Sequence, residues 1–313
     1  MKVVAFAGGV GGAKLASGLQ DTLAPGNLTV VVNTTDDFEL HGLCICPDLD
    51  TVMYTLSGMV NPATGWGVVD ESFNALGMMV RYGEEAWFKL GDRDLATHIL
   101  RTSRLHAGET LTRITADLSA ALGVQSTILP MCDEPVATVV QSPEGPLEFQ
   151  EYFVRRAQSE EVLGVRFRGI EAARPTEDVL AALAAADLVI LCPSNPIVSI
   201  APILAVPGMQ EALVAAPAPR VAVSPIVGGR ALKGPADRML RSMGHEVSAV
   251  GVARIYEGLL EAMVVDDADR DQRESVEDLG MRVLVTDAIM RDEPDRARLA
   301  REVLEFGGDL ARR

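Results

Sequence analysis

Short apolar runs alternate with segments of helical periodicity at both ends of the chain. Lys2–Ala7 and Leu28–Val32 have the pattern of buried strands, and a glycine-rich turn and a helix over Ala13–Leu23 separate them. The same alternation returns in the last third. There we predict strands at Asp187–Cys192, Arg220–Val223 and Arg282–Val285, and helices at Glu177–Ala185, Met209–Ala215, Pro235–Met243, Gly251–Met263 and Arg296–Phe306. Strands that alternate with helices predict a mainly parallel α/β sheet.

The middle of the chain interrupts this alternation. Residues 50–123 have mostly helical periodicity, clearest over Leu111–Leu122. Three short runs then predict a β region with a hairpin turn near residues 142–145: Gln125–Leu129, Val136–Gln141 and Leu147–Val154. We therefore expect one α/β domain over residues 1–313, with an inserted, mostly helical region at about 50–155 that covers the carboxyl edge of the sheet.

Composition narrows the class of protein. The 313 residues include 44 acidic and 28 basic ones, a net charge of −16, so no bulk basic face exists for nucleic-acid phosphates. Hydrophobic residues at 48% fit a globular protein. No apolar run reaches the ~20 residues that span a bilayer, so we expect a cytoplasmic protein without membrane segments. Four scattered cysteines indicate reduced thiols: Cys44, Cys46, Cys132 and Cys192.

The segment from Gly8 to Lys14 (GGVGGAK) follows a strand and opens a helix, as the anion sites of α/β folds do. It is not a Walker loop, since Ala13 stands where the second glycine belongs and Leu15 replaces the magnesium-binding Ser/Thr. It is a poor dinucleotide fingerprint, because Lys14 replaces the third glycine and Asn33 follows the next strand where an acidic residue belongs. Phosphate binding is the favoured interpretation, and a tight strand–helix turn is the alternative.

Four carboxylates lie within fifteen residues after the second strand: Asp36, Asp37, Asp48 and Asp50. They would repel one another unless a cation or hydroxyl donors share their site. The alternatives are a solvated acidic turn for the first pair and helix capping for the second.

Two further motifs have open interpretations. Arg93, between two aspartates in LGDRD, is either a local ion pair or a positioned functional group, and the nearby His98 is more typical of a packed or capping histidine. Ser194 and Asn195, at the end of a strand, would contact a base or ribose, or form a plain proline turn.

Together these segments closely resemble the 2-phospho-L-lactate transferase family of the CofD type, and they do so along nearly the whole chain. The motifs PDLDT, GDRD and PSNP are more specific for this family than the glycine-rich segment is. The matching segments are GGVGGAK (8–14), DD (36–37), HGLCICPDLDTVMYTL (41–56), LGDRDLATH (90–98), ILPMCDEP (128–135), FQEYFVR (149–155), CPSNPIVSIAPIL (192–204) and SPIVGG (224–229).

This resemblance implies a Rossmann-like α/β enzyme, usually dimeric, in the biosynthesis of coenzyme F(420). Such an enzyme moves a phospholactyl group, or a phosphoenolpyruvyl group in the bacterial branch, from a guanosine diphosphate donor to the ribityl hydroxyl of the deazaflavin Fo. GMP leaves, and Mg²⁺ assists. The segments GGVGGAK and HGLCICPDLDT resemble those of the bacterial branch, but the sequence does not distinguish a lactyl donor from an enolpyruvyl donor.

The resemblance also suggests a role for each candidate residue. Near the donor diphosphate we place Gly8, Gly9, Gly11, Gly12 and Lys14, with Ser194 and Asn195 toward guanosine. We place Asp36 and Asp37 on magnesium. Asp48, Asp50 and Arg93 go to the deazaflavin side, where one of the two aspartates would act as general base. The alternative function is a non-catalytic regulatory protein of the same fold that binds a nucleotide sugar, and a nicotinamide oxidoreductase is disfavoured by Lys14 and Asn33.

Overall fold

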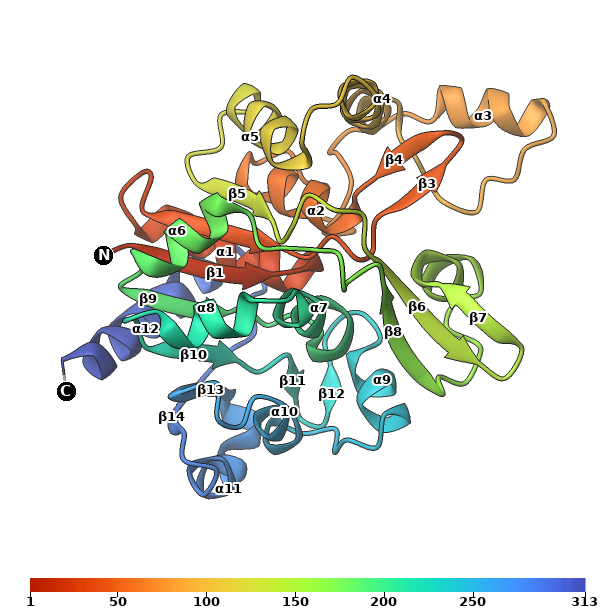
Figure 1. Ribbon diagram of the computed structural model, residues 1–313. Coiled ribbons are helices and arrows are strands. Elements are labelled where there is room, and N and C mark those ends of the chain that lie inside the picture. Colours follow the sequence, from red (N-terminus) through yellow and green to blue (C-terminus); the bar gives the residue numbers. More distant parts are fainter. Residues whose placement is uncertain (313) are drawn as a thin grey trace.

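Seven parallel strands form the central sheet of the protein, whose computed structural model describes residues 1–312 (Figure 1). Their order is β14-β13-β10-β9-β1-β2-β5, and β1 lies between β2 and β9, with Val3 opposite both Leu28 and Leu188. The strands are β1 (Val3–Ala7), β2 (Leu28–Val32), β5 (Thr127–Pro130), β9 (Leu188–Leu191), β10 (Arg220–Val223), β13 (Ala262–Asp266) and β14 (Arg282–Thr286). The predicted parallel α/β fold is confirmed.

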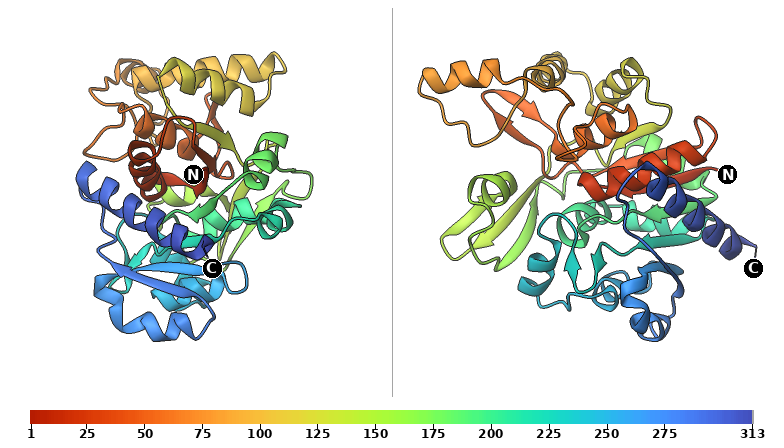
Figure 2. Two further views of the ribbon diagram at one scale, coloured as in Figure 1. Left: turned by 90° about the vertical axis from the view of Figure 1, so that its left-hand side faces the viewer. Right: turned by 180° about the vertical axis from the view of Figure 1, so that it is seen from behind.

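Helices cover both faces of this sheet, because its strands are apolar on both sides. Along β1, Val3, Ala5 and Ala7 face one helix layer, while Val4 and Phe6 face the other. The first layer contains α1 (Gly9–Thr22), α2 (Pro47–Leu56), α5 (Leu111–Ala121) and α12 (Glu293–Ala311), with α1 and α12 side by side (Figure 2). The second contains α6 (Glu177–Ala184), α7 (Ala201–Ala205), α8 (Met209–Ala215), α9 (Ala236–Ser242), α10 (Ala249–Ile255) and α11 (Arg273–Glu277).

Smaller elements project from the carboxyl edge of the sheet (Figure 1). Helices α3 (Asn74–Arg81) and α4 (Asp92–His106) lie beside the hairpin of β3 (Phe38–Leu40) and β4 (Leu43–Ile45). A three-stranded antiparallel sheet joins β6 (Ala137–Ser142), β7 (Gly145–Glu148) and β8 (Gly164–Arg168), and a second hairpin joins β11 (Ile226–Val227) and β12 (Arg230–Ala231). Within the expected insertion at about 50–155, the helices come first, and β5 returns to the central sheet.

Helices leave β1 and β9 toward opposite faces, so their carboxyl ends border the crevice where open α/β sheets bind ligands. The glycines after β1 are not a loop here, since α1 starts at Gly9 and not at the predicted Ala13. A Cβ atom at Gly11 would lie 2.3 Å from the carbonyl oxygen of Pro193, and one at Gly12 would lie 2.5 Å from Oγ of Ser194. Both glycines therefore allow α1 to pack directly against the segment after β9.

Two sequence predictions were wrong in this part of the fold. The helix predicted over Gly251–Met263 ends at Ile255, and Gly258 turns the chain (φ +77) before the buried strand β13. A strand buried on both faces lacks alternation, so its periodicity does not distinguish it from a helix. The strand predicted over Leu147–Val154 covers only the end of β7, and the π-helical turn η1 (Glu151–Arg155) follows.

Within residues 1–312, no single helix is long and apolar enough to cross a membrane. The bent pair Pro196–Ala205 and Met209–Ala215 passes that test by length and composition alone. Its apolar side chains, such as Ile200, Ile203 and Leu213, belong to the core.

We predict that Gly11→Ala lowers the free energy of unfolding by about 1–3 kcal/mol, because the new methyl group overlaps a backbone carbonyl that cannot move alone. Gly77→Ala is the matched control, since Gly77 lies in α3 with nothing within 4 Å of its added Cβ. We expect that change to stabilise α3 by up to about 1 kcal/mol. Urea unfolding of both variants measures the contrast, and equal stabilities would contradict it.

Candidate functional site

A buried polar cluster lies where β2 ends and α2 begins. Asn33, directly after β2, is completely buried, and its Nδ2 donates to Oδ2 of Asp48 (3.0 Å) and to the carbonyl of Val198 (3.3 Å). Its Oδ1 accepts from the backbone N–H of Thr35 (3.1 Å). This one side chain thus links the end of β2 to the start of α2 and to η2 (Pro196–Ile200), the turn that follows β9, a role that its sequence position does not reveal.

Asp48 lies at the N-terminal end of α1. A Cβ atom at Gly8 would lie 2.6 Å from its Oδ2, and one at Gly9 would lie 3.4 Å from its Oδ1. Burial raises the pKa of Asp48 from 3.8 to about 6, although Asn33 and Gly9 oppose the shift. The helix N-terminus that the sequence assigned to a phosphate is therefore in contact with a carboxylate of the protein itself.

Asp36 lies near this carboxylate, whereas Asp37 lies near Cys44 and Arg101, and each has a buried Oδ1 atom without a hydrogen-bond partner. Burial, followed by the charges of Asp48 and Asp37, raises the pKa of Asp36 well above its usual range. Burial also raises the pKa of Asp37, followed by its neighbour Cys44. Such unsatisfied buried oxygens are rare in folded proteins, and they mark a place where a cation would be stabilised.

Asp50 has a cationic partner. It forms a two-bond ion pair with Arg101 of α4: Nη1 donates to Oδ2 at 3.1 Å, and Nη2 donates to Oδ1. Arg101 is only 2% exposed, and Asp50 raises its pKa even though burial opposes the charge. Because both oxygens of Asp50 contact Arg101, this carboxylate orients α4 against α2 and does not face the space beside Asp36.

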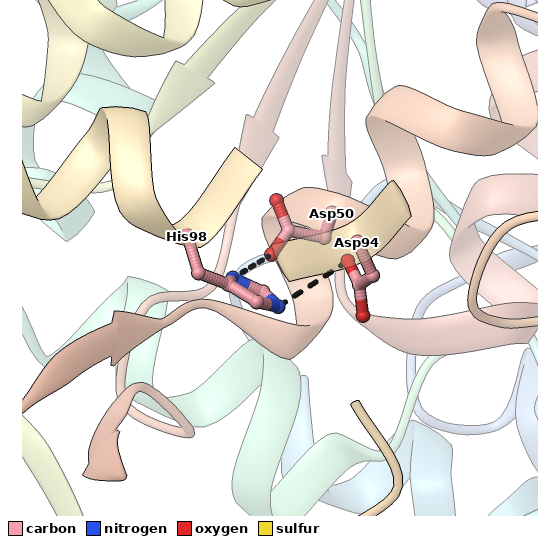
Figure 3. A group of neighbouring side chains, drawn as sticks. All are labelled: Asp50, Asp94 and His98. Carbon is pink, nitrogen blue, oxygen red and sulfur yellow. Dashed lines mark ion pairs between the residues drawn. The ribbon is translucent and has the colours of Figure 1, made fainter. Parts of the chain in front are cut away.

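His98 of α4 lies between the carboxylates of Asp50 and Asp94 (Figure 3). Its Nδ1 is 3.6 Å from Asp50, its Nε2 is 3.2 Å from Asp94, and the hydroxyl of Tyr54 donates to Asp94 (2.7 Å). The ligand atoms of Asp50, Asp94 and His98 lie within 4.8 Å of one another, so they could hold a metal ion. A metal there would compete with Arg101 for Asp50, whereas Asp36 and Asp37 have unpaired oxygens.

The motif around Arg93 joins α4 to the segment before α3. Asp92 accepts hydrogen bonds from Ser72 and from the first backbone N–H groups of α3, and these bonds lower the pKa of Asp92. Arg93 is exposed, and its guanidinium donates to the carbonyl of Val69 (3.0 Å). Within the described residues, Arg93 has no contact with the buried aspartates.

The other candidate residues have partners in the protein. Oγ of Ser194 accepts from the N–H of Gly8 (3.1 Å) and donates to its carbonyl (2.8 Å), so it fastens β9 to β1. Asn195 caps η2 (Pro196–Ile200) by accepting from the N–H of Ile197 (2.9 Å). Lys14 extends toward α12 and donates to the carbonyl of Met290 (2.7 Å).

Comparison with known families gives a match along almost the full chain. A family model described as 2-phospho-L-lactate transferase CofD matches residues 3–300. The chain belongs to the CofD family. The resemblance stated from its motifs is thereby confirmed.

The CofD relatives carry two different names. A phosphoenolpyruvate transferase from Streptomyces griseus is 43% identical, with 99% of each chain covered. A 2-phospho-L-lactate transferase from Methanosarcina acetivorans is 40% identical, with 97% of each chain covered. Among solved structures, a member of the UPF0052 family from Bacillus halodurans has a TM-score of 0.66 over 97% of this chain and 98% of its own, and its 15% identity supports the fold alone.

We predict that Arg101→Met lowers the free energy of unfolding by about 3–5 kcal/mol, because it removes the guanidinium that contacts both oxygens of the buried Asp50 carboxylate. Arg104→Met, on the same helix, removes a more exposed arginine that pairs with Glu109 and Asp117, and it should cost far less stability because solvent screens these pairs. The double variant Asp50→Asn/Arg101→Met should recover part of the loss. Equal losses for the two single variants in urea unfolding would contradict the prediction.

Asp48 predicts a pH dependence of stability. A carboxyl with a raised folded-state pKa stabilises the fold below pH 4, and this contribution is lost as the pH rises through about 6. The loss amounts to at most about 3 kcal/mol. Asp48→Asn removes the titration, so we expect the variant to gain stability relative to the unmodified protein between pH 4 and pH 7. Unfolding curves recorded across this range test the sign, and a relative loss would contradict it.

Proposed function

We propose that this chain is a magnesium-dependent transferase of coenzyme F(420) biosynthesis. It moves a phosphoenolpyruvyl or phospholactyl group from a guanosine diphosphate donor to the ribityl hydroxyl of the deazaflavin Fo, and it releases GMP. The substrates are therefore small molecules. The expected homodimer and cytoplasmic location, and the absence of nucleic-acid and membrane partners, stay predictions.

One observation carries this proposal. Asp36 lies near the charges of Asp48 and Asp37 at the carboxyl edge of a CofD-family sheet, and Asp36 and Asp37 each keep one buried oxygen atom without a hydrogen-bond partner. Oxygen ligands of this kind suit Mg²⁺, which takes one or two carboxylates and completes its shell with water and phosphate oxygens. We place magnesium on Asp36 and Asp37, where it would neutralise charge on the donor phosphates. A protein that only binds a nucleotide sugar has no need for these buried charges.

The reaction itself needs one proton acceptor. The ribityl oxygen forms a bond to the phosphorus that bears the transferred group, the bond from that phosphorus to the oxygen of GMP breaks, and GMP keeps the electron pair. We assign the hydroxyl proton to Asp48, because its pKa of about 6 lies close to neutral pH, where a general base is most effective. Asn33 holds this carboxylate in place by donating to its Oδ2.

The geometry changes the role that we propose for Asp50. Its two oxygens contact Arg101, so we propose that Asp50 positions α2, and with it Asp48, and does not itself act as base. The proposed contact of Arg93 with Fo rests on the family resemblance alone, since its side chain contacts Val69 here.

A transfer assay tests the proposal. We expect the protein, incubated with Fo, Mg²⁺ and either synthetic donor, to release GMP and form the phosphodiester of Fo. Asp36→Asn and Asp37→Asn should raise the magnesium concentration needed for half-maximal turnover. Asp48→Asn should lower turnover by about 10²–10⁴-fold, the usual contribution of a general base.

Asp21→Asn is the control, because Asp21 is an exposed carboxylate on α1 and should leave the assay unchanged. Comparing the two donors decides between the lactyl and the enolpyruvyl group. If GDP binds while neither donor yields GMP, the transferase proposal fails and the regulatory alternative is favoured.

A further inference from the structure

Two cysteine thiols lie next to each other where β4 leads into α2. Cys44 belongs to β4, Cys46 is the residue before α2, and their Sγ atoms are 3.7 Å apart. Residues two positions apart on a strand place their side chains on the same face. The end of β4 thus brings together two thiols that the proposed transfer reaction does not use.

This pair differs from the other two cysteines of the chain. Cys46 is completely buried, whereas Cys44 is partly exposed, so Cys44 is the one that a small solute can reach. The hydrogen bond with Cys46 lowers the pKa of Cys44 to about 7, with help from the charge of Arg101 and against the effect of burial. Burial raises the pKa of Cys132 and of Cys192 to about 12. The thiolate is the reactive form of cysteine, so Cys44 is the better nucleophile.

A small movement is enough to join the two sulfur atoms. Alternate residues of a strand have Cα atoms about 6.6 Å apart, near the upper end of the range that disulfides span. The Sγ atoms of Cys44 and Cys46 would approach from 3.7 Å to about 2.0 Å. A disulfide near the limit of that range is strained, and strained disulfides are readily reduced again, as regulatory ones are.

The pair is connected to the candidate site on more than one side. Asp37 lies near both thiols: after the larger effect of burial, Cys44 raises the pKa of Asp37 and Cys46 lowers it. Cys46 directly precedes α2, which carries the proposed general base. Nη1 of Arg101 donates to the carbonyl of Cys44 (3.4 Å) as well as to Asp50 (3.1 Å). A movement of the two cysteines therefore displaces groups that surround the buried aspartates.

We infer that Cys44 and Cys46 are a redox-modification site, which a hydroperoxide converts to an intramolecular disulfide that inhibits the protein reversibly. The thiolate of Cys44 attacks one oxygen of the hydroperoxide, and the O–O bond breaks. The other oxygen leaves with the electron pair and takes up a proton, which gives water or an alcohol. The thiol of Cys46 then attacks the sulfur of the sulfenic acid at Cys44, the S–S bond forms, and water leaves. The two thiols lose two electrons, and the hydroperoxide gains them.

Peroxide treatment of the full chain, followed by alkylation and mass spectrometry, tests the modification. We expect the peptide with both cysteines to lose two hydrogen atoms and to resist alkylation until dithiothreitol reduces it. Cys44→Ser and Cys46→Ser should each abolish this product. Cys132→Ser is the matched control, because it removes a cysteine outside the pair and should leave the product unchanged. Oxygen added to Cys44 without a disulfide, or a disulfide between two chains, would overturn the pairing.

The transfer assay tests the inhibition, and this arm rests on the proposed function. A displacement of about 1 Å at a reacting group can cost about 10²-fold in rate, so oxidation should lower GMP release by about ten- to hundred-fold. Dithiothreitol should restore the release, and thermal melting should show that the oxidised protein is still folded. Cys44→Ser and Cys46→Ser should keep their own turnover after peroxide.

The outcomes separate this inference from the proposed function. Equal turnover before and after disulfide formation would overturn the inhibition, and so would loss of turnover in the two serine variants after peroxide. If the reduced protein releases no GMP from either donor while the disulfide still forms, the proposed function falls and the modification site stands.

Discussion

The direct contact between the segments that follow β1 and β9 determines the rest of the site. Ser194 exchanges two hydrogen bonds with Gly8, and the carbonyl of Pro193 lies where a side chain at Gly11 would be. This approach starts α1 at Gly9, one residue after the end of β1, so the beginning of α1 lies beside Asp48 in the first turn of α2. A residue larger than glycine would separate the two segments, and the polar cluster would lose one of its walls.

The aspartates beside these segments fall into two groups, according to whether their oxygen atoms have partners. Burying a carboxylate costs several kcal/mol unless a cation or hydrogen bonds compensate for the loss of water. Asp50 has Arg101, whose guanidinium contacts both of its oxygens. Asp36 and Asp37 keep unpaired oxygens, and burial raises the pKa of each. The protein thus satisfies both oxygens of Asp50 in one ion pair and leaves one oxygen each of Asp36 and Asp37 without a partner, although Arg101 also lies close enough to Asp37 to oppose the rise in its pKa.

Local sequence patterns predicted most of the fold, because apolar runs and turn residues indicate where its strands and helices begin and end. β2, α8 and β10 have the predicted bounds, whereas β13 was missed because a fully buried strand lacks periodicity. The acidic cluster was visible as four aspartates close in sequence. Its partners were not: Arg101 lies 51 positions after Asp50, and Asn33 carries no motif of its own. Tertiary packing alone brings such pairs together, and the only local signal for Arg101 was its place one helical turn after His98.

The first turn of α1 also explains how a chain with a net charge of −16 could accept an anionic substrate. At physiological ionic strength, charges further away than about 8 Å are largely screened, so the overall excess of acid has little effect inside a cleft. The charged side chains that lie within the cleft itself then determine whether an anion is attracted. Lys14, Lys233 and Arg296 bring positive charge to one cavity of ≈ 400 Å³ that Val10 also lines, and the carboxylate of Asp48 lies near Gly9, the residue before Val10. Neighbouring residues of one helical turn therefore separate opposite charges, and a substrate that bridges them would be oriented by both.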